Sequence, residues 1–295
     1  MITSRQYADL GNGIRLHYAS CGTRGRPLML FLHGFPEYWG AWEELLPSFA
    51  ATHHAVAPDL RGFNLSSQPL EVAAYRVREI VGDLERFLAH LGVDRTIVVA
   101  HDWGGAVAWQ WAIARPGRVS KLVILNSPHP IPFARDLVSS PEQQRASAYI
   151  NWLRAPGAEG ALAKDDFIRL DEFFLGMLRT DAPWYTAARR ARYHAVWARG
   201  LTGGLNYYRA SPLYPPTADD PGPKSLQLKA ADFRVTVPTL VVWGEADIAL
   251  PVTLLDGLDE LVDDLTVHRL PRATHWVAHE EPDAVARLIR DFIVR

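Results

Sequence analysis

The chain has 295 residues, of which 48% are hydrophobic and 22% charged, and its formal net charge at pH 7 is −2. This composition is typical of a globular protein, the charge gives no reason to expect nucleic acid or an anionic membrane as partner, and the single cysteine, Cys21, excludes an intrachain disulfide. Because the first residues lack the apolar run of a signal peptide and no apolar stretch approaches the ~20 residues of a membrane span, we expect a cytoplasmic protein.

Short apolar runs alternate with amphipathic stretches from the start of the chain. Two segments near residues 5–9 and 14–21, joined through Gly-Asn-Gly, are expected to pair as an antiparallel hairpin at a sheet edge. Later runs are apolar on both faces, which suits strands buried in a parallel sheet. In chain order, these runs lie at 28–32, 54–58, 96–100, 121–125 and 239–243.

Helical patterns separate these predicted strands. Residues 75–92 carry their apolar side chains on one stripe and end in glycine, and residues 104–115 form a helix rich in small residues. Residues 283–294 form a terminal amphipathic helix. Strands and helices that alternate with right-handed crossovers predict an α/β fold, a mostly parallel central sheet flanked by helices.

The alternation stops at about residue 129 and resumes at about residue 235. The interval between is rich in Tyr, Trp, Phe and Arg and is patterned as helices. Because open α/β sheets bind ligands beyond the carboxyl ends of their strands, we expect this insertion to cover that edge. The predicted organisation is a core domain of residues 1–128 and 231–295 with a helical cap at 129–230; a separate helical domain fits less well, since the chain returns to the sheet.

The stretch from Ala100 to Gly104 reads Ala-His-Asp-Trp-Gly and joins a predicted strand to a predicted helix. The pattern small-x-nucleophile-x-small is typical of a nucleophile elbow, in which small residues permit a sharp turn and the helix N-terminus favours negative charge. Asp102 occupies the position at which serine hydrolases carry a hydroxyl. An aspartate is also a preferred helix N-cap, so the motif alone leaves a structural role equally open.

Two further segments favour catalysis. In this architecture the acid and then the histidine follow the nucleophile along the chain, and Asp247 lies just beyond a strand while His275 lies in a loop before the last helix. His275 could orient on Asp247 and activate water. The segment His-Gly-Phe-Pro-Glu after the strand at 28–32 could supply the N–H of Phe35, which with that of Trp103 would form an oxyanion hole.

A carboxylate nucleophile restricts the chemistry. Attack on an ester or amide would give a labile anhydride, whereas displacement at a saturated carbon gives an alkyl ester on Asp102, which water activated by His275 could hydrolyse. Two leaving groups suit this scheme. A halide needs only weak donors such as an indole N–H. The oxygen of a strained epoxide leaves as an alkoxide and needs a proton donor, for which tyrosines, with pKa values near ~10, are suitable.

With these residues in view, the sequence resembles the epoxide hydrolases of the α/β-hydrolase superfamily over nearly its whole length. The family's HGFPE segment corresponds to residues 33–37 and its HDWG elbow to residues 101–104. Its GHW segment corresponds to Thr-His-Trp around His275, where threonine replaces glycine. The resemblance implies an α/β-hydrolase fold with a helical cap and hydrolysis of an epoxide to a vicinal diol.

The resemblance also implies that two cap tyrosines, Tyr149 and Tyr208, clamp and protonate the epoxide oxygen. Tyr208 lies in the segment Asn-Tyr-Tyr-Arg, which is similar to the family's Asn-Trp-Tyr-Arg. Tyr149 begins the segment YINWLRAP, which keeps the family's proline but has Leu-Arg where the family has Phe-Gln. The implied partners are a small apolar epoxide and water, with a homodimer left open.

No cofactor or metal is implied, because no His, Asp and Glu cluster has ligand spacing. Three alternatives stay open. A haloalkane dehalogenase shares the Trp after the aspartate but usually has Asn where Phe35 stands, and a fluoroacetate dehalogenase needs arginines where Trp103, Ala106 and Val107 stand. A catalytically silent binding protein on this fold would usually lack a member of the triad, and none is missing.

Overall fold

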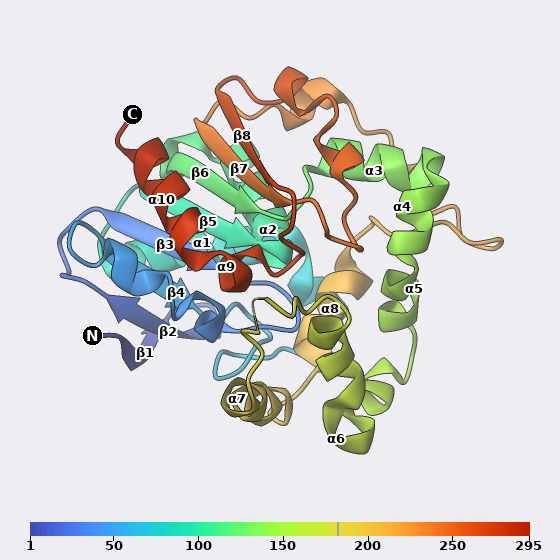
Figure 1. The fold of residues 1–295 in the computed structure, drawn as a ribbon, viewed down its shortest axis with the longest axis horizontal. Helices are drawn as coiled ribbons and strands as arrows, with labels where there is room; N and C mark the ends of the chain where they lie inside the picture. Colours follow the sequence, from blue (N-terminus) through green and yellow to red (C-terminus); the bar gives the residue numbers. More distant parts are fainter. Residues whose placement is uncertain (182) are drawn as a thin grey trace.

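The computed structural model describes residues 1–181 and 183–295, in which eight strands form one sheet (Figure 1). Their order is β1-β2-β4-β3-β5-β6-β7-β8. The pairs β1–β2 and β2–β4 are antiparallel and the other neighbours are parallel. The strands are β1 (Thr3–Asp9), β2 (Arg15–Cys21), β3 (Leu28–Leu32), β4 (His54–Pro58), β5 (Thr96–His101), β6 (Val119–Leu125), β7 (Thr239–Gly244) and β8 (Leu265–Leu270).

The predicted fold class is confirmed. The edge hairpin is present as β1 and β2, and the five predicted parallel strands are found with ends that move by at most two residues. Alternate side chains of β3 explain why such a strand is apolar throughout. Leu28, Leu30 and Leu32 pack into one layer of the core and Met29 and Phe31 into the other, so both faces of the strand are buried.

Helices cover both faces of the sheet. α1 and α2 pack in the layer that holds Leu30, whereas α10 and two 3-10 turns after β3 pack in the layer that holds Phe31. The predicted helix at 104–115 begins two residues earlier than expected, so that Asp102 belongs to its first turn. The helices of this part are α1 (Val77–Leu91), α2 (Asp102–Ala114), α9 (Val277–Glu280) and α10 (Pro282–Ile293).

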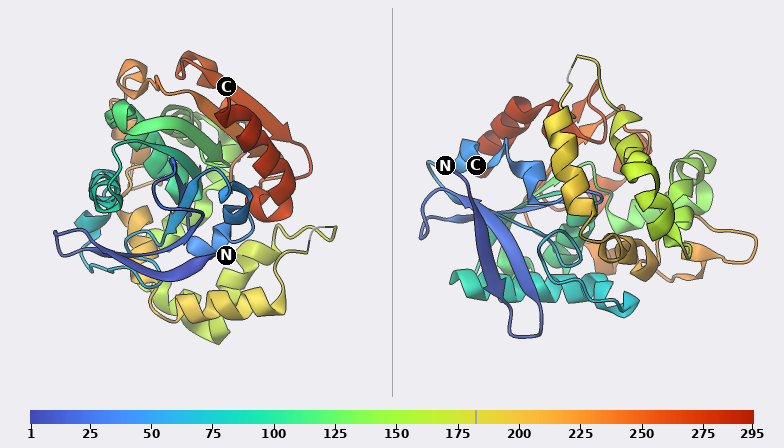
Figure 2. Two further views of the ribbon diagram at one scale, coloured as in Figure 1. Left: turned by 90° about the vertical axis from the view of Figure 1, so that its left-hand side faces the viewer. Right: turned by 90° about the horizontal axis from the view of Figure 1, so that it is seen from below.

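The segment between β6 and β7 is helical, as expected. Figure 1 shows its helices gathered on one side of the sheet, and Figure 2 shows both chain termini on the opposite side. Within the described residues no helix is both long and apolar enough to cross a bilayer. The inserted helices are α3 (Pro130–Ser139), α4 (Pro141–Ala146), α5 (Ala148–Arg154), α6 (Ala158–Leu175, with a break at 164–167), α7 (Ala187–Trp197) and α8 (Thr202–Ala210).

Candidate active site

Asp102 lies at the corner where β5 passes into α2. Its φ is +49°, a left-handed conformation that is uncommon for a residue with a side chain and often marks a functional site. Gly104 makes this corner possible, because a Cβ atom there would overlap the backbone of Leu32 in β3. The carboxylate does not cap its own helix, since Asp102 Oδ1 accepts the N–H of Phe35 at 2.7 Å. The N-cap interpretation of Asp102 is therefore wrong.

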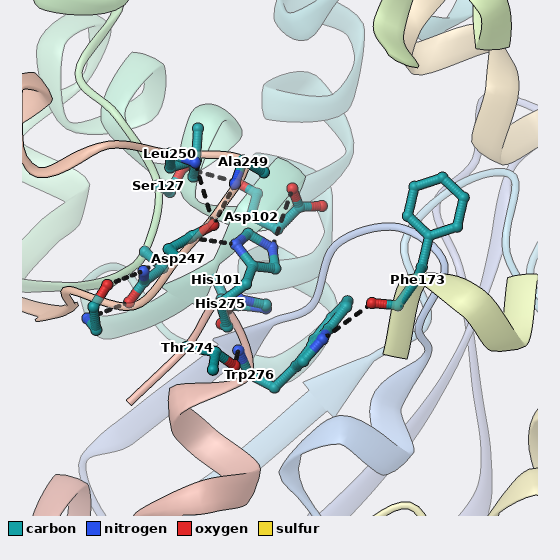
Figure 3. Close-up of polar contacts among 12 residues, drawn as sticks. His101, Asp102, Ser127, Phe173, Asp247, Ala249, Leu250, Thr274, His275 and Trp276 are labelled. Carbon is teal, nitrogen blue, oxygen red and sulfur yellow. Dashed lines mark hydrogen bonds and ion pairs between the residues drawn. The ribbon is translucent and has the colours of Figure 1, made fainter. Parts of the chain in front are cut away.

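His275 lies between two carboxylates (Figure 3). Its Nδ1 donates to Asp247 Oδ2 at 2.7 Å, and its Nε2 is 3.7 Å from Asp102 Oδ2. Burial lowers the pKa of this imidazole, but the charge and hydrogen bond of Asp247, together with the charge of Asp102, raise it to a net value of about 9. His275 thus contacts both of the other residues that the sequence singled out as a triad, at one edge of the sheet.

Asp247 is held by more than His275. Its Oδ1 accepts the N–H groups of Ala249 at 2.8 Å and Leu250 at 3.1 Å, and its Oδ2 also accepts Asn126 Nδ2 at 2.9 Å. Burial raises the pKa of this carboxyl, but the charge and hydrogen bond of His275 outweigh burial and bring the pKa below its ordinary value, so the group is ionised. The sequence analysis missed Asn126, although its place directly after β6, the neighbour of β7, could have identified it.

The loop after β3 approaches the carboxylate of Asp102 closely. A Cβ atom at Gly34 would overlap Asp102 Oδ1, so only glycine allows the next residue, Phe35, to bring its N–H to that oxygen. Trp103 is the second residue of α2, and an N–H in the first turn of a helix has no acceptor within the helix. The two N–H groups expected to form an oxyanion hole therefore belong to segments that meet at Asp102.

Tyr149 on α5 and Tyr208 on α8 face this carboxylate from the inserted helices. Their rings are 6.3 Å apart and nearly perpendicular, and the Tyr208 ring is 5.0 Å from the ring of Trp103. Burial, followed by the neighbouring Tyr149 and the charge of Asp102, raises the pKa of Tyr208 well above its usual value, and burial likewise raises the pKa of Tyr149. Both phenols are therefore protonated at neutral pH and able to donate.

Two cavities border the site, with volumes of about 540 and about 430 Å³. Each is within the range of small-molecule sites. Asp102, Tyr149 and Tyr208 line both of them. A molecule whose reacting atom contacts Asp102 can therefore extend in two directions.

A buried polar cluster lies next to His275. The sequence predicted only the motif that contains Glu37, and not the cluster. The Glu37 carboxylate accepts hydrogen bonds from Tyr193 Oη and His279 Nε2, each at 2.7 Å, and its Oε2 is 3.4 Å from His101 Nδ1. His101 Nε2 in turn donates to the backbone oxygen of His275 at 2.8 Å. Burial raises the pKa of Glu37, but these histidines lower it well below its ordinary value. The cluster fixes the backbone that carries His275.

Among the described residues, no group of three or more His, Cys, Asp or Glu side chains is arranged to hold a metal ion. The residues at the site instead provide a carboxylate, a base with its partner acid, backbone donors and two phenols. This set can perform nucleophilic displacement, proton donation and activation of water.

Comparison with known proteins agrees with this geometry. Residues 27–282 match the family described as alpha/beta hydrolase fold. The chain is 33% identical to epoxide hydrolase 1 of Caenorhabditis elegans, over 95% of this chain and 68% of the relative, and 33% identical to human epoxide hydrolase 4, over 96% and 76%. A crystal structure of Bacillus megaterium epoxide hydrolase in complex with an inhibitor superposes with a TM-score of 0.89, at 32% identity over 98% of this chain and 100% of that chain.

Proposed function

The chain belongs to the alpha/beta hydrolases and, within them, to the epoxide hydrolases, and from this premise we propose that it acts through a covalent ester on Asp102. It hydrolyses epoxides. The observation that carries the mechanism is the environment of one carboxylate. Asp102 is held by a backbone donor on one oxygen, lies beside His275 through the other, and shares two cavities with two protonated tyrosines.

In the first step, Asp102 Oδ2 attacks a carbon of the epoxide and the bond from that carbon to the epoxide oxygen breaks. Tyr208 and Tyr149 hold this oxygen, and one of them donates its proton to the alkoxide that forms. The other oxygen of Asp102, Oδ1, stays on the N–H of Phe35 and becomes the carbonyl oxygen of the ester.

In the second step, His275 Nε2 takes a proton from water, and the resulting hydroxide attacks the ester carbon. Negative charge then develops on Oδ1, where the N–H groups of Phe35 and Trp103 can stabilise it. When this intermediate collapses, the bond from the ester carbon to the substrate oxygen breaks, and the imidazolium gives its proton to that oxygen, which releases the diol. The remaining water proton, left on the new carboxyl group, returns to the tyrosinate formed in the first step, which regenerates both the Asp102 carboxylate and the phenol. Asp247 stabilises the imidazolium meanwhile, as its 2.7 Å hydrogen bond to Nδ1 supports.

We also propose that residues 129–230 act as a cap over a core of residues 1–128 and 231–295. Tyr149 and Tyr208 both come from the inserted helices, so the cap would supply the proton donors and the core the nucleophile and base. The substrate would be a small apolar epoxide. A reducing, cytoplasmic location is supported by the single, buried cysteine.

The intact mass of the His275→Gln variant tests the mechanism. After brief exposure to styrene oxide, we expect a gain of one epoxide mass on the peptide that carries Asp102, because the ester forms but water is not activated. The double variant Asp102→Asn/His275→Gln should gain nothing. An adduct from 1-bromobutane alone would assign the protein as a dehalogenase, and no adduct from either reagent would contradict the covalent mechanism.

A further inference from the structure

The inserted helix α7 reaches the polar cluster next to His275 through two residues on one face. Arg189 and Tyr193 are four residues apart, so their side chains lie on the same side of the helix. The hydroxyl of Tyr193 donates directly to Glu37 Oε1 at 2.7 Å. Arg189 reaches the same carboxylate through His279, because its Nη1 donates to the Nδ1 of that ring at 3.1 Å and the Nε2 of the ring donates to Glu37 Oε1 at 2.7 Å. One inserted helix therefore contacts the cluster at two points.

The contact with Arg189 determines which nitrogen of His279 carries the proton. A guanidinium has donors only, so the Nδ1 that faces it must be the acceptor and holds no proton. The proton of the ring is then on Nε2, where the hydrogen bond to Glu37 requires it. Arg189 thus fixes both the tautomer and the orientation of this imidazole.

The surroundings of Arg189 and His279 leave these two side chains little freedom. The ring of Trp184 stacks on the imidazole of His279 at 4.1 Å, with 11° between the two planes. Arg189 is only 8% exposed, and a guanidinium so buried is costly unless its donors have partners. Its Nη2 donates to Glu44 Oε1 at 2.8 Å, but the side chain of Glu44 is 42% exposed. The inner end of the guanidinium is therefore the one that faces His279 and the buried cluster.

We propose, building on the function proposed above, that Arg189 is a positioning residue for the second step, the hydrolysis of the alkyl-enzyme. Arg189 holds the ring of His279, and this ring holds the carboxylate of Glu37. The other oxygen of that carboxylate, Oε2, is 3.4 Å from Nδ1 of His101. The Nε2 of His101 donates to the backbone oxygen of His275 at 2.8 Å, so the path ends on the residue that activates water.

This path does not pass through the groups that open the epoxide. Ring opening uses Asp102 with Tyr149 of α5 and Tyr208 of α8, whereas Arg189 is on α7. A general loosening of the inserted helices would move both tyrosines and slow ring opening as well. The rates of the two steps, measured separately, therefore distinguish a positioning role from a merely structural one.

Single-turnover kinetics with styrene oxide test the proposal. In Arg189→Gln, we expect the alkyl-enzyme to form at the rate of the wild type but to decay about tenfold more slowly. Arg189→Lys keeps a charged donor and should decay faster than Arg189→Gln. The matched control is Arg192→Gln, which removes a more exposed ion pair of the same helix, to Glu43 at 2.7 Å, and should change neither rate. Equal slowing of both steps in Arg189→Gln, or an unchanged rate of decay, would overturn the proposal.

The tautomer of His279 tests the first contact of the path without any substrate. NMR of isotope-labelled histidine nitrogens should show an unprotonated Nδ1 in the wild type, with the signal identified by its loss in His279→Gln. In Arg189→Gln this signal should move, because Nδ1 loses its donor. A protonated Nδ1 in the wild type would overturn the proposal, even if the variants were too unstable for kinetics. Failure to detect any ester on Asp102 would instead count against the proposed function, so the two failures are distinguishable.

Discussion

His275 has to be neutral to accept a proton from water, yet its neighbours favour its charged form. Asp247 and Asp102 raise its pKa to about 9 despite burial, so the imidazole is mainly protonated at neutral pH before substrate arrives. Formation of an ester would convert Asp102 into a neutral group and remove one of the two charges that raise this pKa. In the proposed mechanism, the first chemical step therefore prepares the base for the second.

This coupling predicts the pH dependence of ester hydrolysis. Below its pKa the imidazole is protonated and inactive, so the decay rate of the alkyl-enzyme should rise with pH, with an inflection below the value of about 9 of the free enzyme. Asp247→Asn should move the inflection lower still and slow the decay, because the imidazolium loses its partner. Rapid-quench mass spectrometry at a series of pH values measures both effects. An inflection in Asp247→Asn at or above that of the wild type would contradict this account.

At the scale of elements, the corner between β5 and α2 determines where the carboxylate points. The left-handed φ of Asp102 turns its side chain away from α2 and toward the loop after β3. Ser127 supports the corner from the end of β6 by donating its hydroxyl to the Asp102 backbone oxygen at 2.7 Å. Three neighbouring strand ends thus hold one strained residue.

Gly104→Ala should destabilise the protein by about 3 kcal/mol, because the added methyl group meets backbone rather than a movable side chain. Gly160→Ala is the matched control. Gly160 lies in the first turn of α6 with open space around its Cα, so alanine there should stabilise by about 0.5–1 kcal/mol. Urea unfolding midpoints of the two variants measure the difference. A Gly104→Ala protein as stable as the wild type would contradict the close packing of this corner against Leu32.

At the scale of the whole molecule, the inserted helices are joined to the loops of the core by hydrogen bonds that are wholly or partly buried. Trp197 Nε1 donates to the backbone oxygen of Pro36 at 2.7 Å, and Tyr207 Oη donates to that of Arg61 at 2.9 Å. Trp276 Nε1, from the sheet side, donates to the backbone oxygen of Phe173 at 3.2 Å. These contacts determine how far Tyr208 and Tyr149 lie from Asp102. Changes at this interface are therefore expected to affect both stability and activity.

The adjacent residues Tyr207 and Tyr208 should separate these two roles. Tyr207→Phe leaves the Arg61 oxygen without its partner and should cost about 1–2 kcal/mol of stability with little effect on ring opening. Tyr208→Phe should keep the stability but slow epoxide opening about 10²-fold, and slow the hydrolysis of a preformed ester far less. Thermal unfolding and single-turnover kinetics of both variants measure this. Equal slowing of both steps in Tyr208→Phe would contradict a proton-donor role.

Much of this protein could be predicted from local sequence. The five inner parallel runs are apolar on both faces because both faces are buried, and they were located to within two residues. Asp102, Asp247 and His275 could be selected because each follows a strand in a fold whose strand ends converge on one edge. The first residue of α2 was not predicted correctly, because the left-handed turn at Asp102 depends on close packing against β3.

Other features were decided only by the tertiary structure. Asn126 and Asp247 are 121 residues apart in the sequence, and Glu37 and His279 are 242 residues apart, so the contacts themselves cannot be read from local sequence. The two cavities are likewise formed by side chains from the sheet and the inserted helices together. The sequence by itself thus determined the candidate reacting groups, because their type and order are local properties. The shape and charge around them arise only when distant segments pack against one another.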